Sequence, residues 1–202
     1  MTFFYWFALN VTRLVRPLLW RVRFTGRENI PAQGGYVVAC NHRSLADPIL
    51  LAHGFNRQLF FLGKDELFNV PVLGTILNWA GVIGIQRGTG DMSAVDSAIQ
   101  KLRDGGLLGI FPEGTRSPTQ QPLRFKSGMA HMAKTAHVGV IPCAVIFSGK
   151  MKWMTKVEMR YGAPIPYEEL FGEEQSAAAL KRATTLVQQR INQLLGLEEA
   201  AR

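Results

Sequence analysis

The chain has 202 residues, of which 47% are hydrophobic and 19% are charged, so it can bury a sizeable core. This composition excludes an intrinsically disordered, collagen-like, coiled-coil or disulfide-scaffold protein. Lysine and arginine outnumber aspartate and glutamate by 23 to 15. The resulting net charge of +8 indicates an anionic partner, such as a phospholipid surface, a phosphorylated molecule or nucleic acid.

The first twenty residues combine aromatic, aliphatic and basic side chains. Six consecutive apolar or aromatic residues begin at Phe3, further apolar residues follow at helical spacing, and Arg13 and Arg16 lie among them. Such helices bury one face among lipid headgroups, whereas the alternative is a helix packed on the protein's own core. We predict an interfacial helical segment over residues 1–20, which Pro17 should bend or end.

No stretch of this chain has the roughly 20 mainly apolar residues that a membrane-spanning helix needs. No basic residue precedes the apolar start and no small-residue cleavage pattern follows it, so a secretory signal is not indicated. We expect peripheral attachment to the cytoplasmic side of the cell membrane. Cys40 and Cys143 lie in apolar runs and are expected to be buried thiols, with one disulfide between them as the open alternative.

Residues 21–202 are predicted to form one α/β domain, because short apolar runs alternate there with longer helical patterns. Strands are expected at 22–25, 36–40, 59–62, 82–85, 107–111, 140–146 and 156–160. Helices are expected at 45–53, 65–79, 92–104, 128–136 and 175–195. Alternation of this kind predicts a mostly parallel central sheet flanked by helices.

The first polar cluster follows the expected strand 36–40 and contains His42 and Asp47. These side chains can meet if His42 lies on the turn after the strand and Asp47 lies in the first turn of a helix capped by Ser44. A carboxylate that holds one imidazole nitrogen leaves the other free to take a proton from a substrate. The alternative is a loop histidine and a helix-start aspartate that only satisfy backbone groups.

Two kinds of chemistry are not indicated by the surroundings of His42. No GxSxG motif occurs and no serine or cysteine is an evident partner, so the proton should come from the substrate. The other histidines show no ligand spacing with His42, and the two cysteines are not paired as CxxC. We therefore expect no metal ion.

Cations follow three other expected strands, and Lys64, Arg87 and Arg116 are those cations. Gly114 allows a tight turn before Arg116, and Glu113 can hold that arginine or a substrate hydroxyl. We expect the three cations to converge on one phosphate-sized anion. The alternative is a set of solvated charges together with a surface turn closed by a salt bridge.

The order of these clusters resembles the glycerolipid acyltransferase family, in particular its 1-acylglycerol-3-phosphate members. The matching blocks are NHRSLAD at 41–47, GIQR at 84–87, FPEGTRS at 111–117, FKSG at 125–128 and VIPCAV at 140–145. The NHxxxxD pattern alone is a weak signal, but its combination with FPEGTRS at this separation is specific.

The resemblance implies that His42 is the general base and that Asp47 orients it. It implies acyl transfer from acyl-CoA or acyl carrier protein to the free hydroxyl of lysophosphatidic acid, which gives phosphatidic acid without a cofactor. It also implies a set of residues that bind the acceptor and its phosphate: Lys64, Arg87, Glu113, Gly114, Thr115 and Arg116.

Other functions remain open from the sequence. The acceptor is alternatively glycerol-3-phosphate or another lysophospholipid. A membrane-bound hydrolase would direct water at the same carbonyl, and a basic module would bind lipid or nucleic acid without catalysis. No nucleic-acid-binding motif is apparent, so we expect no nucleic-acid partner.

Overall fold

The computed structural model describes residues 2–71, 73–85, 92–172, 174 and 176–197. The strands are β1 (Trp20–Thr25), β2 (Tyr36–Cys40), β3 (Leu59–Lys64), β4 (Val82–Ile85), β5 (Leu107–Ile110), β6 (Gly139–Ile146) and β7 (Thr155–Tyr161). The helices are α1 (Phe3–Leu19), α2 (Asp47–Ala52), α3 (Leu73–Trp79), α4 (Met92–Arg103), α5 (Gly128–Ala136), α6 (Tyr167–Phe171) and α7 (Ala177–Leu195). Two 3₁₀ turns, η1 (Arg27–Asn29) and η2 (Asp65–Asn69), complete the described elements.

The strands form one sheet in the order β1-β7-β6-β2-β5-β3-β4. All neighbouring pairs are parallel except β6 and β7, so the predicted mostly parallel sheet is confirmed. The carboxyl ends of β2, β3, β4, β5 and β6 therefore lie at the same edge. Because β5 is hydrogen-bonded to β2, the polar segments that follow these two strands emerge side by side.

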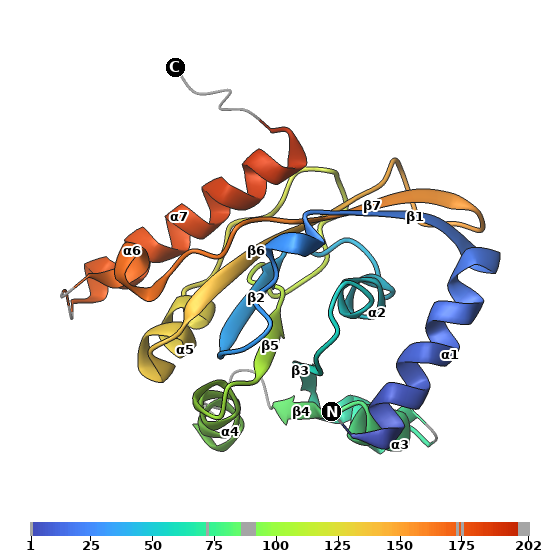
Figure 1. Ribbon diagram of the computed structural model, residues 1–202, viewed down its shortest axis with the longest axis horizontal. Coiled ribbons are helices and arrows are strands. Elements are labelled where there is room, and N and C mark those ends of the chain that lie inside the picture. Colours follow the sequence, from blue (N-terminus) through green and yellow to red (C-terminus); the bar gives the residue numbers. More distant parts are fainter. Residues whose placement is uncertain (1, 72, 86–91, 173, 175, 198–202) are drawn as a thin grey trace.

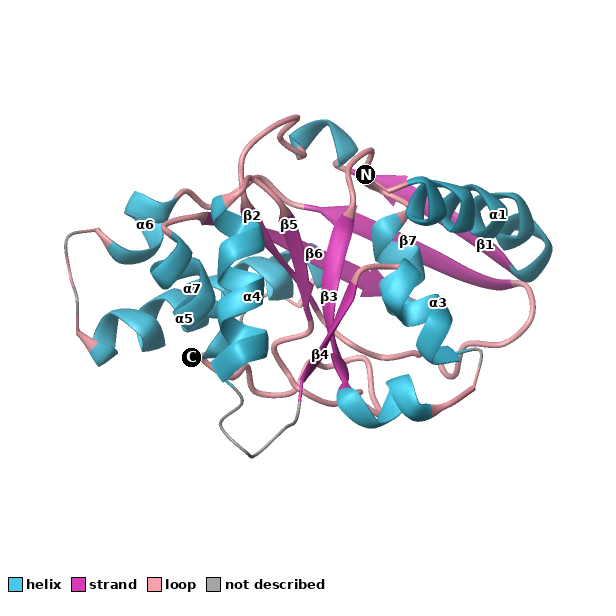
Figure 2. Ribbon diagram, turned by 90° about the horizontal axis from the view of Figure 1, so that it is seen from below, coloured by secondary structure: helices cyan, strands magenta, loops and turns pink. Residues whose placement is uncertain are grey.

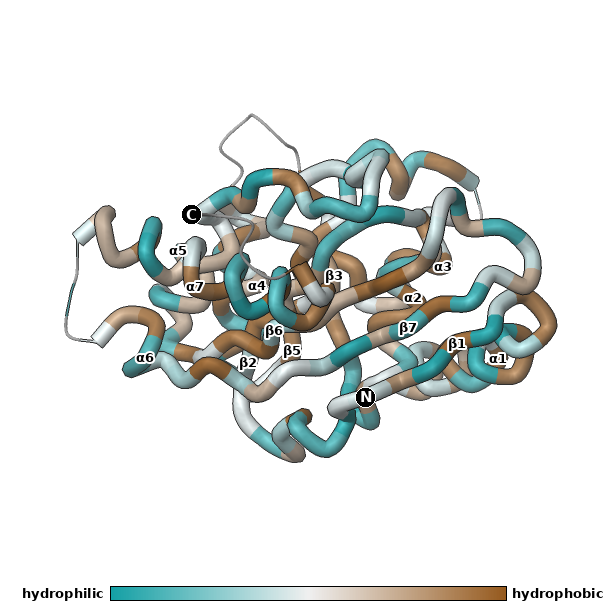
Figure 3. The backbone as a smooth tube through the Cα atoms, turned by 90° about the horizontal axis from the view of Figure 1, so that it is seen from above, coloured by the Kyte–Doolittle hydropathy of each residue, from teal (hydrophilic) through white to brown (hydrophobic). Residues whose placement is uncertain are grey.

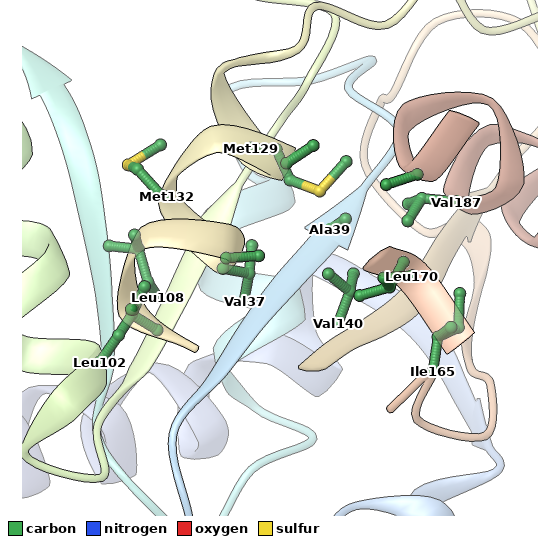
Figure 4. Packing of buried hydrophobic residues seen from close by; sticks show 14 of the residues in the cluster. Val37, Ala39, Leu102, Leu108, Met129, Met132, Val140, Ile165, Leu170 and Val187 are labelled. Carbon is green, nitrogen blue, oxygen red and sulfur yellow. The ribbon is translucent and has the colours of Figure 1, made fainter. Parts of the chain in front are cut away.

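Helices cover both faces of the sheet (Figures 1 and 2), with α4 to α7 on one side and α1, α2 and α3 on the other. Alternate residues of β2 enter two separate cores, since successive strand side chains point to opposite faces. Val37 and Ala39 pack under α5 and α7 (Figure 4), whereas Val38 and Cys40 pack under α2. The burial of β2 on both faces leaves only its end exposed to a substrate.

Helix α1 has one face on the core and one face in solvent. Tyr5 and Leu9 are buried in the same cluster as α2, and the Tyr5 hydroxyl accepts a hydrogen bond from the backbone N–H of Leu59 at 3.1 Å. The helix continues for two residues beyond Pro17, so the proline does not end it. No helix within the described part of the chain is long and apolar enough to span a bilayer.

Several predicted elements have the predicted bounds, and others differ for local reasons. Strands 36–40 and 82–85 and helix 128–136 are confirmed as predicted. The predicted helix 65–79 is wrong, because the chain before Pro71 is extended, as a residue that precedes proline prefers, and the segment divides into η2 and α3. Helix α6 was not predicted, since five residues are too few to show a helical period.

Two predictions about single residues also have a clear outcome. Cys40 and Cys143 are free, buried thiols on neighbouring strands, and burial raises the pKa of both. Ser44 is not the N-cap of α2, because the helix begins only at Asp47 and Ala46 occupies the cap position. The Asp47 side chain instead accepts hydrogen bonds from the N–H groups of Arg43 and Ser44, in the turn that precedes the helix.

Candidate active site

His42, in the turn after β2, and Asp47, at the start of α2, form the predicted hydrogen-bonded pair. Nδ1 of His42 lies 2.9 Å from Oδ2 of Asp47, whose side chain is completely buried. The same oxygen accepts hydrogen bonds from the backbone N–H groups of Arg43 at 2.6 Å and Ser44 at 2.7 Å. Three donors therefore fix the carboxylate, and the carboxylate fixes the imidazole ring.

The other nitrogen of His42 is available for chemistry. A neutral imidazole that donates from Nδ1 carries its lone pair on Nε2. Within the described residues Nε2 has no hydrogen-bond partner, and the side chain is 18% exposed. The ring stacks on Phe111 at a centroid distance of 4.2 Å, and Phe111 in turn stacks on Phe61. Aromatic packing on one side and Asp47 at one edge thus hold the ring while Nε2 stays accessible.

The segment after β5 clamps the backbone of His42 from both sides. Oε1 of Glu113 accepts a hydrogen bond from the His42 N–H at 2.7 Å, and the carbonyl of His42 accepts one from the N–H of Ser117 at 2.7 Å. Oε2 of Glu113 accepts a third bond, from the N–H of Leu123 at 2.9 Å. The two predicted polar clusters are therefore joined directly.

Glu113 does not hold an arginine, contrary to one of the two roles expected for it. Its side chain lies in the interior, with the residue only 2% exposed, and each oxygen accepts a backbone N–H. Burial raises the pKa of this carboxyl, the two backbone hydrogen bonds and His42 oppose that rise, and Asp47 adds to it. Both carboxylate oxygens are therefore occupied by backbone donors, and one of these donors is the N–H of His42.

Two further residues of the NHRSLAD block hold the site, and no role was predicted for either. The Asn41 amide exchanges hydrogen bonds with the backbone of Val145, at 3.0 Å from Nδ2 and 2.8 Å to Oδ1. Arg43 donates to the carbonyls of Phe147 and Gly149, and its guanidinium lies over the Phe147 ring at 4.1 Å. Their position beside His42 was the available signal, but their partners lie about a hundred residues away.

Of the expected phosphate ligands, Lys64 ends β3, and Thr115 and Arg116 follow β5, whose carboxyl end lies at the same edge of the sheet. Thr115 and Arg116 are exposed after β5. Lys64 is exposed at the end of β3, with its ammonium 3.8 Å from the carboxylate of Glu66. Arg87 lies outside the described residues. The geometry therefore leaves convergence on one anion a prediction.

Gly114 is the residue that lets the FPEGTRS segment turn. Its φ of +73° is a conformation that strains other residues, and a Cβ there would lie 2.9 Å from Nζ of Lys126. Lys126 therefore extends across this turn, and its N–H donates to the carbonyl of Pro112 at 2.9 Å. Lys126 belongs to the FKSG block, but no site role was predicted for it.

Comparisons with known proteins agree with this arrangement. The model of a family described as Acyltransferase matches residues 21–146, which is more than half of the chain. The 1-acyl-sn-glycerol-3-phosphate acyltransferase of Bacillus subtilis is 30% identical over 94% of this chain and 96% of that protein. The alpha form of the mouse enzyme of that name is 32% identical over 71% of this chain, which spans about half, 51%, of the mouse protein.

A solved structure shares the fold. The crystal structure of the 1-acyl-sn-glycerophosphate acyltransferase from Thermotoga maritima superposes with a TM-score of 0.72 at 24% sequence identity. The superposition covers 98% of this chain and 82% of that chain. The family match, the Bacillus relative and the His42–Asp47 pair at the end of β2 lead to one conclusion: this chain belongs to the acyltransferase family.

Proposed function

We propose that this protein transfers a fatty acyl group from an acyl thioester to the free hydroxyl of lysophosphatidic acid and so forms phosphatidic acid. The observation that carries the proposal is the His42–Asp47 pair, which is held by the segment after β5 and whose Nε2 has no partner among the residues that the structure describes. The names of the Bacillus and mouse relatives support lysophosphatidic acid as the acceptor. Acyl-CoA and acyl carrier protein are the two thioester donors that we propose to compare.

The proposed reaction is a direct transfer with His42 as general base. Nε2 takes the proton of the acceptor hydroxyl while the hydroxyl oxygen attacks the thioester carbonyl, and a tetrahedral intermediate forms. Collapse of that intermediate breaks the carbon–sulfur bond, and the thiolate leaves and takes the proton from the imidazolium. The Asp47 carboxylate stabilises the imidazolium between the two proton transfers. No cofactor takes part in this scheme.

The acceptor phosphate is proposed to bind to cations at the carboxyl edge of the sheet. Arg116 is exposed on the segment whose first part clamps His42, so a phosphate there would lie near the reacting hydroxyl. A guanidinium suits this task because its donors match the geometry of phosphate oxygens. Lys64 and Arg87 are proposed as further phosphate ligands, and Thr115 as a hydroxyl ligand.

We also propose that the protein acts as a peripheral protein on the cytoplasmic surface of the cell membrane. The outer face of α1 supports this, because its apolar side chains are exposed and do not pack against the core of the protein. They are Phe3, Phe4, Trp6, Phe7, Val11, Leu14, Val15, Leu18 and Leu19. Interfacial helices bury such a face at the boundary between headgroups and acyl chains.

The test is a product analysis with a labelled acyl thioester and a panel of acceptors. We expect labelled phosphatidic acid when lysophosphatidic acid is present, from acyl-CoA or from acyl carrier protein. Free fatty acid formed regardless of acceptor would show a hydrolase instead. Product from glycerol-3-phosphate or another lysophospholipid alone would move the acceptor assignment, and lipid binding without any product would show a binding module.

A further inference from the structure

The connection between β6 and β7, residues 147–154, exposes basic and aromatic side chains next to the candidate active site. We call this segment the β6–β7 loop. Trp153 is 78% exposed, although a large aromatic side chain is usually buried in a protein that meets only water. Lys150 and Lys152, which precede it, are also exposed. No part of the proposed acyl transfer uses any of these three side chains.

The loop is hydrogen-bonded directly to the two residues that follow His42, which we call the catalytic turn. Arg43 donates to the carbonyls of Phe147 and Gly149, the second at 3.1 Å. The hydroxyl of Ser44 lies 3.4 Å from the sulfur of Met151, which accepts its hydrogen bond. The two residues that follow His42 therefore bind the loop, so the position of the loop and the position of His42 depend on each other.

The loop is also fastened to the end of α1. The indole N–H of Trp153 donates to the carbonyl of Leu18 at 2.8 Å, and the N–H of Met154 donates to the carbonyl of Leu19 at 2.7 Å. Figure 1 shows the connection reaching the corner where α1 passes into β1. Figure 3 shows hydrophobic stretches of α1 beside this corner. The exposed indole therefore continues the apolar face of α1.

The charged residues of α1, β1 and the β6–β7 loop are all basic. Residues 1–27 and residues 114–157 contain no aspartate or glutamate. Strands β1 and β7 place Arg21 beside Lys156, so basic residues of the two segments lie in neighbouring positions. Glu158, the next acidic residue along β7, is paired with Arg160 at 2.9 Å. A basic, partly apolar surface of this kind complements anionic phospholipid headgroups that overlie acyl chains.

We propose that the β6–β7 loop is a second membrane contact, in which Trp153 enters the headgroup region and Lys150 and Lys152 bind anionic phospholipids. Tryptophan suits this place because its ring is apolar and its N–H is polar. The contact goes beyond the attachment proposed for α1, since it involves a separate segment that binds the catalytic turn. Leu45, 77% exposed between His42 and Asp47, is then held toward the bilayer.

The test measures co-sedimentation of the full chain with vesicles of phosphatidylcholine and phosphatidylglycerol, and with vesicles of phosphatidylcholine alone. We expect the double variant K150Q/K152Q to bind the anionic vesicles about 30-fold more weakly, because each lysine near such a surface contributes about fivefold. Its binding to neutral vesicles should match the parent protein. W153S should weaken binding to both kinds of vesicle, whereas W153F, which keeps an apolar ring, should lose much less.

The matched control is K101Q/K181Q, which removes the same charge from α4 and α7 on the opposite face of the molecule. We expect this control to bind like the parent protein. Equal losses in both double variants would overturn the proposal, because net charge alone would then explain the binding. Unchanged vesicle binding by K150Q/K152Q, with weaker binding of acyl carrier protein, would overturn it in favour of an acidic protein partner. None of these measurements requires catalysis, so they are independent of the proposed reaction.

Discussion

At the scale of the residue, His42 is held at its side chain by Asp47 and Phe111 and at its backbone by Glu113 and Ser117. Only the first of these contacts follows from local spacing. Glu113 lies 71 positions from His42 in the sequence, and its buried carboxylate accepts the hydrogen bond of the His42 N–H, which has left the sheet at this point. Removal of such a group tests whether it positions the base or binds the acceptor.

Glu113→Gln should lower kcat and leave the KM for the acceptor nearly unchanged. The amide keeps one acceptor oxygen, so one of the two N–H groups that Glu113 now satisfies loses its partner and the segment shifts. Small displacements of a catalytic group cost up to about 10²-fold in rate, and we expect a loss of about tenfold or more. Steady-state kinetics check this, with Glu169→Gln on α6 as an exposed control. A rise in acceptor KM at normal kcat would instead make Glu113 an acceptor ligand.

Arg116→Ala should raise the KM for lysophosphatidic acid far more than the KM for the thioester. A hydrogen bond to a charged group contributes about 1.5–3 kcal/mol, so the loss of kcat/KM for this acceptor should be roughly tenfold to a hundredfold. Varying each substrate at saturating levels of the other separates the two constants. An effect confined to the thioester would contradict the assignment of Arg116 to the acceptor phosphate.

At the scale of the element, α1 is joined to α2 through a buried histidine. His53 is 3% exposed, and its Nε2 lies 2.9 Å from the hydroxyl of Thr12, which itself donates to the carbonyl of Leu9. Nε2 therefore donates, and Nδ1 is buried without a hydrogen-bond partner among the described residues. Burial lowers the pKa of His53 to about 4, and the charges of Arg16 and Arg13 act in the same direction.

Folding stability should therefore fall as the pH falls from about 6.5 toward 4. The unfolded chain protonates His53 near pH 6.5, whereas the folded chain keeps it neutral down to about 4, so the unfolded state binds more protons in this window. The free energy of unfolding in urea should drop between pH 7 and pH 5, by a smaller amount in His53→Gln. His131→Gln, an exposed change on α5, should follow the parent protein. Parallel pH curves for parent and His53→Gln would refute this.

The elements also show which structural features the sequence could predict. Strands such as 36–40 were predictable because their continuous apolar runs are typical of strands buried on both faces. The division of residues 65–79 into η2 and α3 was not predictable, because the apolar residues keep a helical period across Pro71 although the backbone before Pro71 is extended. Likewise, the His42–Asp47 contact could be expected once His42 was placed in the turn after β2 and Asp47 in the first helical turn, whereas the contacts of Asn41 and Arg43 involve partners 104 positions away.

At the scale of the whole molecule, the residues proposed for catalysis and those proposed for membrane contact occupy connected parts of the structure. His42 and the FPEGTRS segment lie at the same edge of the sheet because they follow the parallel strands β2 and β5. The β6–β7 loop is hydrogen-bonded both to Arg43 at that edge and to the end of α1. The +8 charge suggested an anionic partner without locating it, since composition does not say where charges gather. In the structure, α1 and the β6–β7 loop, whose charged residues are all basic, lie in contact with each other.

A molecule attached in this way should respond to salt. Binding to vesicles that contain phosphatidylglycerol should weaken as NaCl rises from about 0.05 to 0.5 M, because salt screens the attraction between exposed charges. The apolar contribution of α1 should leave residual binding to phosphatidylcholine vesicles that salt does not reduce. Salt-independent binding to both vesicle types would show that the basic surface does not take part.

The central claim is that Nε2 of His42, oriented by Asp47, removes the proton of the acceptor hydroxyl. The most direct measurement is the single-turnover rate of labelled phosphatidic acid formation by His42→Ala, with circular dichroism and urea unfolding as checks on the fold. We expect a folded protein whose rate is lower by about 10²–10⁴-fold or more, with Asp47→Asn impaired in the same direction. A folded His42→Ala protein that forms phosphatidic acid at nearly the parent rate would contradict the account.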